Sequence, residues 1–119
     1  MNVFVDAGQY IISFEIGKEF QCILIVDIYR NNGEHVDSFA VYESSANIPD
    51  IFHKRVSDLS DNVMKFITFE IEKLVKEPNN WISFFDAMQG WRVDDSRLEK
   101  LGLKTPDNQE EDEENDDCD

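Results

Sequence analysis

The stretch Phe20-Gln-Cys-Ile-Leu-Ile-Val-Asp-Ile-Tyr-Arg30 decides the fold. It is rich in β-branched and aromatic residues and contains no Gly or Pro, which is typical of a β-strand. Asn31-Asn-Gly-Glu34 follows, and then a second apolar run, His35-Val-Asp-Ser-Phe-Ala-Val-Tyr-Glu43. An Asn-Gly pair between two such runs favours a type I′ turn, because both central residues of that turn have positive φ. We therefore predict a β-hairpin over residues 20–43.

Two more strands are predicted before this hairpin, over Asn2–Asp6 and Gln9–Ile16. Four consecutive strands joined by tight turns predict an antiparallel meander. The strand over 20–30 is apolar on both faces, which predicts a central position with cover on each side. We expect one face to pack on the helices, with Cys22, Leu24, Val26, Ile28, Phe39 and Val41. The other face carries Ile23, Ile25, Tyr29 and Tyr42, so either a ligand or the segment 81–103 should cover it.

Helical periodicity begins after Pro49, where apolar residues recur at steps of three and four from Phe52 to Val75, and Pro78 ends the pattern. One unbroken helix would contain ~27 residues and extend about 40 Å. Strands are typically ~17–20 Å long, so such a helix is too long for a four-stranded sheet. The sequence therefore predicts either a break near 57–61 or a long helix that projects and pairs with another chain.

Two short helices are predicted after Pro78. The first carries Trp81, Phe84, Phe85 and Met88 at helical spacing. The second begins at the capping-box pattern Ser96-x-x-Glu99, and the acid pair Asp94–Asp95 before it is typical of a helix cap. The predicted fold class is α+β, with a four-stranded antiparallel meander, a long helix and two short C-terminal helices. We expect a single domain over 1–106 and a disordered acidic tail over 107–119.

The tail dominates the charge. The chain has 119 residues and a formal net charge of −15, and its last thirteen residues contain nine acids and no base. The preceding part holds 17 acids and 11 bases, a net charge of −6. The two cysteines are Cys22, in the central strand, and Cys118, in the tail, and we expect no disulfide between them. No secretory segment and no apolar run of ~18 residues is present, which predicts a cytoplasmic protein with no membrane association, in the host cell cytoplasm if viral.

Signatures of catalysis and of cofactor binding are missing from the sequence. His35 and His53 have no metal-ligand spacing, and the five glycines form no phosphate-binding loop. We therefore expect no enzyme activity, no metal and no cofactor. Asp27 is a carboxylate in an apolar strand, and it either faces a groove or pairs with Lys18 or Arg30.

Aromatic and basic residues on the sheet predict a nucleic-acid site. Tyr29 and Tyr42 fall on the face away from the helices, and Lys18 and Arg30 lie at its ends. Single strands are held in this way, because bases stack on aromatic rings and cations contact phosphates. The alternative is that both tyrosines lie at a dimer interface or under the C-terminal helices. The candidate partner-binding residues are Trp81, Phe85 and Trp91, which could equally belong to the core.

Three segments resemble a known group of domains: Ile25-Val-Asp-Ile-Tyr-Arg30, Phe39-Ala-Val-Tyr-Glu43 and Val56-Ser-Asp-Leu-Ser-Asp-Asn-Val63. With the Asn-Gly turn, residues 23–66 resemble the Whirly, Pur-alpha and transcriptional positive-cofactor group of single-stranded nucleic-acid-binding domains. In that group, paired ββββα units dimerise through helices and bind single strands on the sheet. The resemblance implies a homodimer and a site on the sheet. This chain departs from the pattern in its few basic strand residues.

Two functions follow as hypotheses. The first is a non-enzymatic single-stranded DNA-binding protein of viral or bacterial type, whose acidic tail tunes affinity or recruits partners. The second is an acidic inhibitor (a DNA mimic, phage anti-defence or immunity-type protein) that binds the basic site of a nucleic-acid-processing enzyme. An adaptor without a nucleic-acid link is the third reading. The surface charge discriminates the first two: the test is whether Lys18, Arg30, Lys54 and Arg55 converge on one face.

Overall fold

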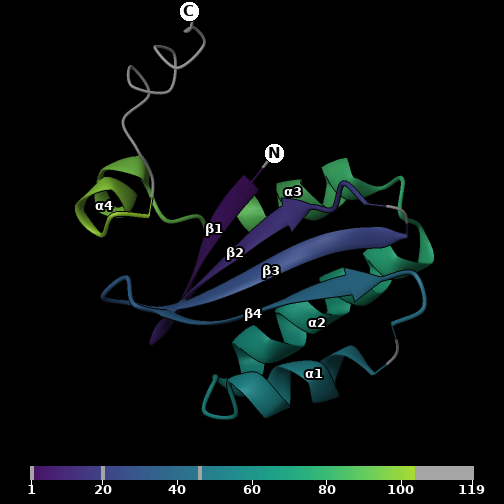
Figure 1. The fold of residues 1–119 in the computed structure, drawn as a ribbon, viewed down its shortest axis with the longest axis horizontal. Helices are drawn as coiled ribbons and strands as arrows, with labels where there is room; N and C mark the ends of the chain where they lie inside the picture. Colours follow the sequence, from purple (N-terminus) through teal and green to yellow (C-terminus); the bar gives the residue numbers. More distant parts are fainter. Residues whose placement is uncertain (1, 20, 46, 104–119) are drawn as a thin grey trace, which may run out of the picture.

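A single antiparallel sheet forms the centre of the molecule (Figure 1). The computed structural model describes residues 2–19, 21–45 and 47–103, and the predicted tail lies outside the described residues. The strands are β1 (Asn2–Ala7), β2 (Tyr10–Ile16), β3 (Cys22–Arg30) and β4 (His35–Tyr42), and they lie in the order β1-β2-β3-β4. The predicted α+β class and antiparallel meander are confirmed.

The β3–β4 hairpin forms as predicted, but its turn is of another type. Gly33 has a φ of 96°, whereas Asn32 does not have positive φ, so the turn is not type I′. The Gly33 N–H donates to the Arg30 carbonyl at 2.9 Å, and the Arg30 N–H donates to the Glu34 carbonyl at 2.8 Å. This is a three-residue loop in which a turn is followed by a left-handed glycine. The Asn32 side chain stabilises it by accepting from the Glu34 N–H at 2.9 Å.

A β-bulge changes which side chains of β3 face the helices. The register with β4 shifts between Cys22 and Leu24, where two β3 residues oppose one β4 residue. As a result Ile23 is 8% exposed and belongs to the main core, while Cys22 lines a recess on the opposite face. The prediction that assigned Cys22 to the helix side and Ile23 to the other side was wrong, because a bulge interrupts the strict alternation of side chains.

In the part of the chain that the structure describes, four helices follow the sheet: α1 (Ile48–Arg55), α2 (Asp61–Lys76), α3 (Trp81–Gln89) and α4 (Asp95–Lys100). The structure has no single long helix over 49–77 and instead breaks at 56–60. Val56 and Leu59 are buried in this linker, and the Leu59 N–H donates to the Val56 carbonyl at 3.0 Å. The break lets both α1 and α2 lie on one face of the sheet (Figure 1).

The two faces of the sheet are covered differently. The main core lies between the sheet and α1, α2 and α3; its largest buried side chains include Phe14, Leu24, Phe52, Ile67, Ile71 and Met88. On the second face a smaller cluster joins Ile11, Val93 and Leu98, with Phe4, Tyr29, Leu101 and Leu103 packed around them. The C-terminal segment 93–103, which includes α4, therefore covers only one end of the second face.

The two edges of the sheet also differ. Residues 91–93 cover the outer edge of β1: the Asp6 N–H donates to the Trp91 carbonyl, and the Val93 N–H donates to the Phe4 carbonyl, both at 2.8 Å. Side chains cap parts of β4, where the Ser38 N–H donates to Asp37 Oδ1 at 2.8 Å and the Tyr42 N–H donates to Ser45 Oγ at 2.9 Å. Such caps limit strand-to-strand association at an edge.

Candidate binding surface on the second face of the sheet

One end of the second face is closed by the C-terminal segment. The Tyr29 ring packs 6.3 Å from the Phe4 ring and 5.3 Å from the His35 ring, measured between centroids. Burial raises the pKa of the Tyr29 hydroxyl, and the negative charge of Asp27 adds to this effect. Asp27 Oδ1 lies 3.7 Å from His35 Nε2, so this carboxylate pairs with His35 and not with Lys18 or Arg30. Tyr29 is thus half-buried and packed against its neighbours.

The other end of the second face is open and forms a recess of about 430 Å³, which we call the sheet-end recess. Its apolar lining comes from Ile16, Cys22, Ile25, Ala40 and Tyr42. Ile25 and Ala40 are directly paired across β3 and β4, and the small Ala40 side chain leaves space beside Tyr42, which is 43% exposed. The sheet-end recess is therefore a shallow apolar depression with an exposed aromatic ring at its side.

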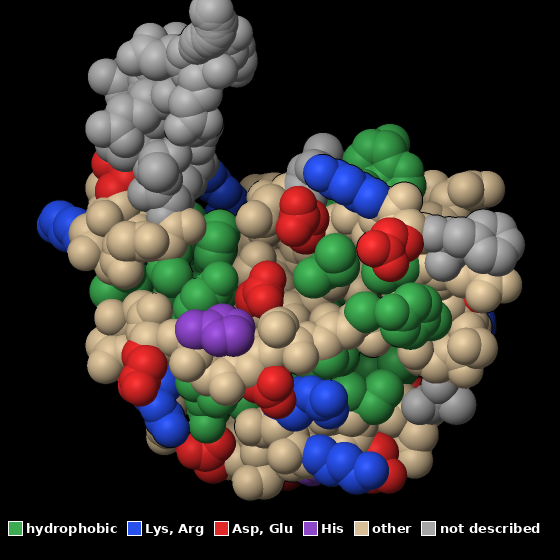
Figure 2. Space-filling model, in the orientation of Figure 1, with side chains coloured by type: hydrophobic (Ala, Val, Ile, Leu, Met, Phe, Trp, Pro, Cys, Tyr) green, Lys and Arg blue, Asp and Glu red, His purple; other side chains and the backbone are tan. Residues whose placement is uncertain are grey.

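Charged side chains surround the sheet-end recess. Glu15, Lys18 and Glu19 line it, and Asp27 lies one row further along the second face. Figure 2 shows acidic side chains beside hydrophobic ones across this part of the molecule. Carboxylates therefore outnumber cations around the sheet-end recess. This charge disfavours the binding of a phosphate and favours the binding of a cationic group.

Gly17 sets the position of the turn that carries Lys18 and Glu19. A Cβ at Gly17 would collide with the carbonyl oxygen and the Sγ of Cys22. The Gly17 N–H donates to the Ile23 carbonyl at 3.0 Å, so the chain returns tightly at this end of the sheet. The absence of a side chain at Gly17 lets the two charged residues approach the open end of β3.

The four predicted nucleic-acid-binding residues are split between the two ends of the sheet. Lys18 and Tyr42 come together at the sheet-end recess. Tyr29 and Arg30 lie at the far end of β3, about 25 Å away along a nine-residue strand at roughly 3.3 Å per residue. Arg30 Nε lies 3.7 Å from Glu34 Oε1, and both side chains are exposed. These residues do not form one stacking platform.

The other two predicted cations lie on α1. Arg55 Nε is 3.2 Å from Asp37 Oδ2, and its guanidinium lies 4.6 Å from the centroid of the Phe39 ring. This contact fixes Arg55 against the helix side of β4. Lys54 is exposed on the same helix. Lys18, Arg30, Lys54 and Arg55 therefore do not converge on one face.

The predicted partner-binding aromatics are mostly packed. Phe85 is 3% exposed and belongs to the main core, so its ring is not accessible to a partner. Trp81 is half-buried against the same core. Trp91 is 37% exposed and stacks on Phe66 with centroids 5.3 Å apart. Phe69, which is 57% exposed, is not among these three residues, although its position off the apolar stripe of the helix indicates an exposed ring.

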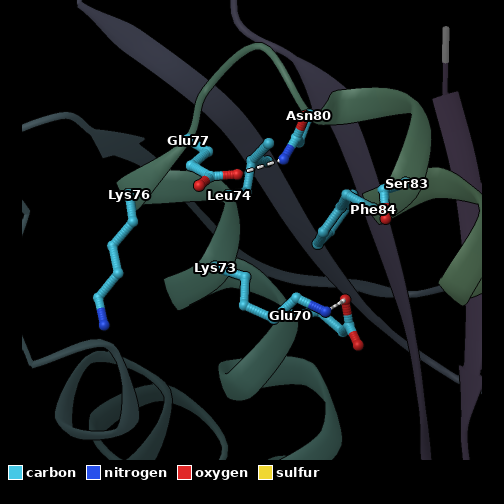
Figure 3. Close-up of a pocket in the computed structure, with 8 residues that line it drawn as sticks. All are labelled: Glu70, Lys73, Leu74, Lys76, Glu77, Asn80, Ser83 and Phe84. Atoms are coloured by element: carbon cyan, nitrogen blue, oxygen red, sulfur yellow. Dashed lines mark hydrogen bonds and ion pairs between the residues drawn. The ribbon is translucent and has the colours of Figure 1, made fainter.

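A second recess, of about 260 Å³, lies between α2 and α3 (Figure 3). Leu74 and Phe84 provide its apolar lining. The Glu70 side chain is only 11% exposed, and Lys73 Nζ lies 3.5 Å from Glu70 Oε1. At the rim Asn80 donates to Glu77. The carboxylates here already have partners within the chain, so this recess offers less unmet charge than the sheet-end recess.

Within residues 2–19, 21–45 and 47–103, no group of three or more His, Cys, Asp or Glu side chains could hold a metal ion. None of the helices in these ranges is long and apolar enough to cross a membrane.

No protein-family model, curated protein or solved structure matches this chain. The chemistry of the second face of the sheet is therefore the basis for a functional proposal.

Proposed function

We propose that this protein is a non-enzymatic acidic binding protein that occupies the basic site of a protein partner. In this proposal it acts as an inhibitor of the DNA-mimic, anti-defence or immunity type, and its target is a nucleic-acid-processing enzyme. The observation that carries the proposal is the acidic and apolar character of the open part of the second face, where Glu15, Glu19 and Asp27 surround Ile25 and Tyr42. Enzymes that act on nucleic acids present cations to phosphates, so they offer a complementary surface.

The overall charge supports the same proposal. The described residues include 17 acids and 10 bases, a net charge of −7, and nine further acids lie in 107–119. Five of these ten bases pair with acids of the chain: Arg30, Arg55, Lys73, Arg92 and Arg97. Binding to a phosphate backbone needs several cations that act together, because each one releases condensed counterions. A dispersed set of cations, half of which already pair with acids of the chain, is a poor basis for this.

Single-stranded DNA binding is the second candidate function. One observation favours it, namely the exposed Tyr42 ring beside Lys18 at the sheet-end recess. A base could stack on this ring while the lysine contacts a phosphate. Glu15 and Glu19 at the same place oppose it by repelling the phosphates.

The test compares both ligands on the same chain. A fluorescent oligo-dT is titrated at low salt with the full chain and with a variant lacking 107–119, and we expect no saturable change in anisotropy. Tagged full-length protein should capture a basic protein in a stoichiometric complex that resists nuclease and dissociates in high salt. The double variant Glu15→Lys/Glu19→Lys should lose this complex. The control Glu72→Lys/Glu99→Lys, with the same charge change on α2 and α4, should keep it.

If oligo-dT binds saturably and Tyr42→Ala weakens this binding, the inhibitor hypothesis is rejected and single-stranded DNA binding is supported. A complex that persists equally in both charge-reversal variants would show that the second face is not the contact surface.

A further inference from the structure

We propose that the sheet-end recess receives a single apolar side chain of a basic protein partner, while lysines or arginines beside that side chain pair with Glu15 and Glu19. This inference depends on the proposed function and makes it specific. It assigns the centre of the interface to Ile25, Ala40 and Tyr42 and its charged rim to the two glutamates.

The recess is large enough to receive an apolar side chain. Its volume of about 430 Å³ falls within the range of pockets that hold small ligands. Ile25 and Ala40 form its base on neighbouring strands, and Tyr42 stands beside them with 43% of its surface exposed. Exposed tyrosines around apolar pockets are frequent hot spots of protein interfaces, because they bury a large area with little loss of side-chain freedom.

The charges at the rim define the partner. Among the described residues that line the recess, Lys18 is the one cation beside Glu15 and Glu19, and Asp27, one row further along the second face, is itself close to His35. An anionic ligand would be repelled here, whereas a partner with cations around an apolar centre satisfies both features of the site. An enzyme surface that normally faces nucleic acid has this composition, with basic residues next to residues that contact bases.

Neither the chain's own tail nor a second copy is a suitable occupant. Residues 107–119 contain nine acids and no base, so Glu15 and Glu19 would repel them. Two copies of the chain would bring the same carboxylates together, each copy with a net charge of −15. The segment 93–103 lies at the other end of the second face, where Arg97 Nη1 is 3.3 Å from Asp6 Oδ2 and holds it in place.

The probes for the test are synthetic peptides with one leucine, phenylalanine or tryptophan flanked on each side by two arginines. Each is titrated at low salt into ¹⁵N-labelled full-length protein and followed by NMR. We expect saturable shifts of the amides of Ile25, Ala40 and Tyr42. A matched peptide with serine at the centre should bind about tenfold more weakly, as expected for loss of a hot-spot contact. A peptide with glutamates in place of the arginines should not bind.

Variants complete the test. Tyr42→Ala should weaken binding of the apolar peptides about tenfold, and Ala40→Phe should weaken it by at least as much, because the added ring occupies the space over Ile25 and beside Tyr42. The control Phe69→Ala, which removes an exposed aromatic ring from α2, should leave the affinity unchanged. The ¹H–¹⁵N spectrum of each variant establishes that the sheet is folded.

The outcomes separate this inference from the proposed function. Shifts confined to α2 or α3, or equal affinity for the serine and leucine peptides, would contradict binding of an apolar side chain at the sheet-end recess. Either result would still be consistent with an acidic protein that binds basic partners. If none of the arginine-flanked peptides binds saturably, the proposed role of the sheet-end recess is also contradicted. If oligo-dT then binds at Tyr42, the proposed function fails as well.

Discussion

The Tyr10 hydroxyl joins the sheet to the linker between α1 and α2. It donates to Asp58 Oδ1 at 2.6 Å, across 48 positions of sequence. We expect Tyr10→Phe to lower the free energy of unfolding by about 1.5 kcal/mol, the lower end of the range for a hydrogen bond to a charged group, because Asp58 is exposed. Urea unfolding at pH 7 measures this, with Tyr42→Phe at the exposed sheet-end recess as the matched control.

The pH dependence of this effect identifies its cause. The hydrogen bond to Asp58, then burial and the Asp58 charge, raise the pKa of Tyr10 above its ordinary value of 10.0, and Arg30 opposes them. The protonated hydroxyl is therefore favoured in the folded state. Its contribution to stability is complete below about pH 10 and is lost as the pH rises through the folded-state pKa. The stability difference between wild type and Tyr10→Phe should shrink above about pH 10; a constant difference would assign it to packing.

At the scale of single elements, the cap of α4 is the best-defined helix terminus. The Asp94 side chain accepts from the Arg97 N–H at 3.0 Å and from the Ser96 hydroxyl at 3.2 Å. The predicted acid cap is confirmed here, and it is Asp94 that caps the helix, so the capping box at Ser96 and Glu99 was wrong.

Removing this cap should loosen α4. We expect Asp94→Ala to cost about 0.5–2 kcal/mol of local stability, the range measured for N-cap residues. Hydrogen exchange of the amides of Leu98 and Leu103 should become faster, while exchange in β3 stays unchanged. Glu99→Ala, an exposed acid within α4, is the control. Equal acceleration in both variants would mean that the cap contributes nothing specific.

The sequence predicts the elements better than it predicts their contacts. Alternation and the Asn-Gly pair are local signals, and they correctly predict the hairpin and the meander. The bulge at Cys22 has no such signal, because it depends on pairing with β4. The break after α1 was one of two predicted alternatives, and burial of Val56 and Leu59 against the sheet selects it.

The candidate site was predictable only in part. Lys18 and Tyr42 come together because adjacent strands bring the two ends of the hairpin region side by side. The sequence left two alternatives for the cover of this face, a ligand or the segment 81–103, and the structure shows that Leu98 and Leu101 of this segment pack with Ile11 and Tyr29. This long-range packing decides that Tyr29 is half-covered while Tyr42 remains exposed.

At the scale of the whole molecule, the charge of the tail should control the rate of encounter with a partner. Deleting 107–119 removes nine acids and changes the formal net charge from −15 to −6. Long-range attraction mainly raises association rates and is screened by salt. We expect the deletion to slow association with the arginine-flanked peptides and to reduce the salt dependence of that rate, with little change in dissociation. Stopped-flow fluorescence measures both rates, and faster association of the truncated protein would contradict steering by the tail.

The cover of the β1 edge by residues 91–93 has a consequence for biosynthesis. Val5 forms its bridge with Arg92, so β1 is completed by a segment that is translated long after it. Proteins fold progressively during synthesis, from the N-terminus onward. Throughout translation of the helices, the nascent β1 therefore exposes a free edge that can pair with a neighbouring nascent chain. If translation stops before Trp91, the truncated polypeptide has an uncovered β1 edge. We expect such a product to aggregate more readily than the full chain.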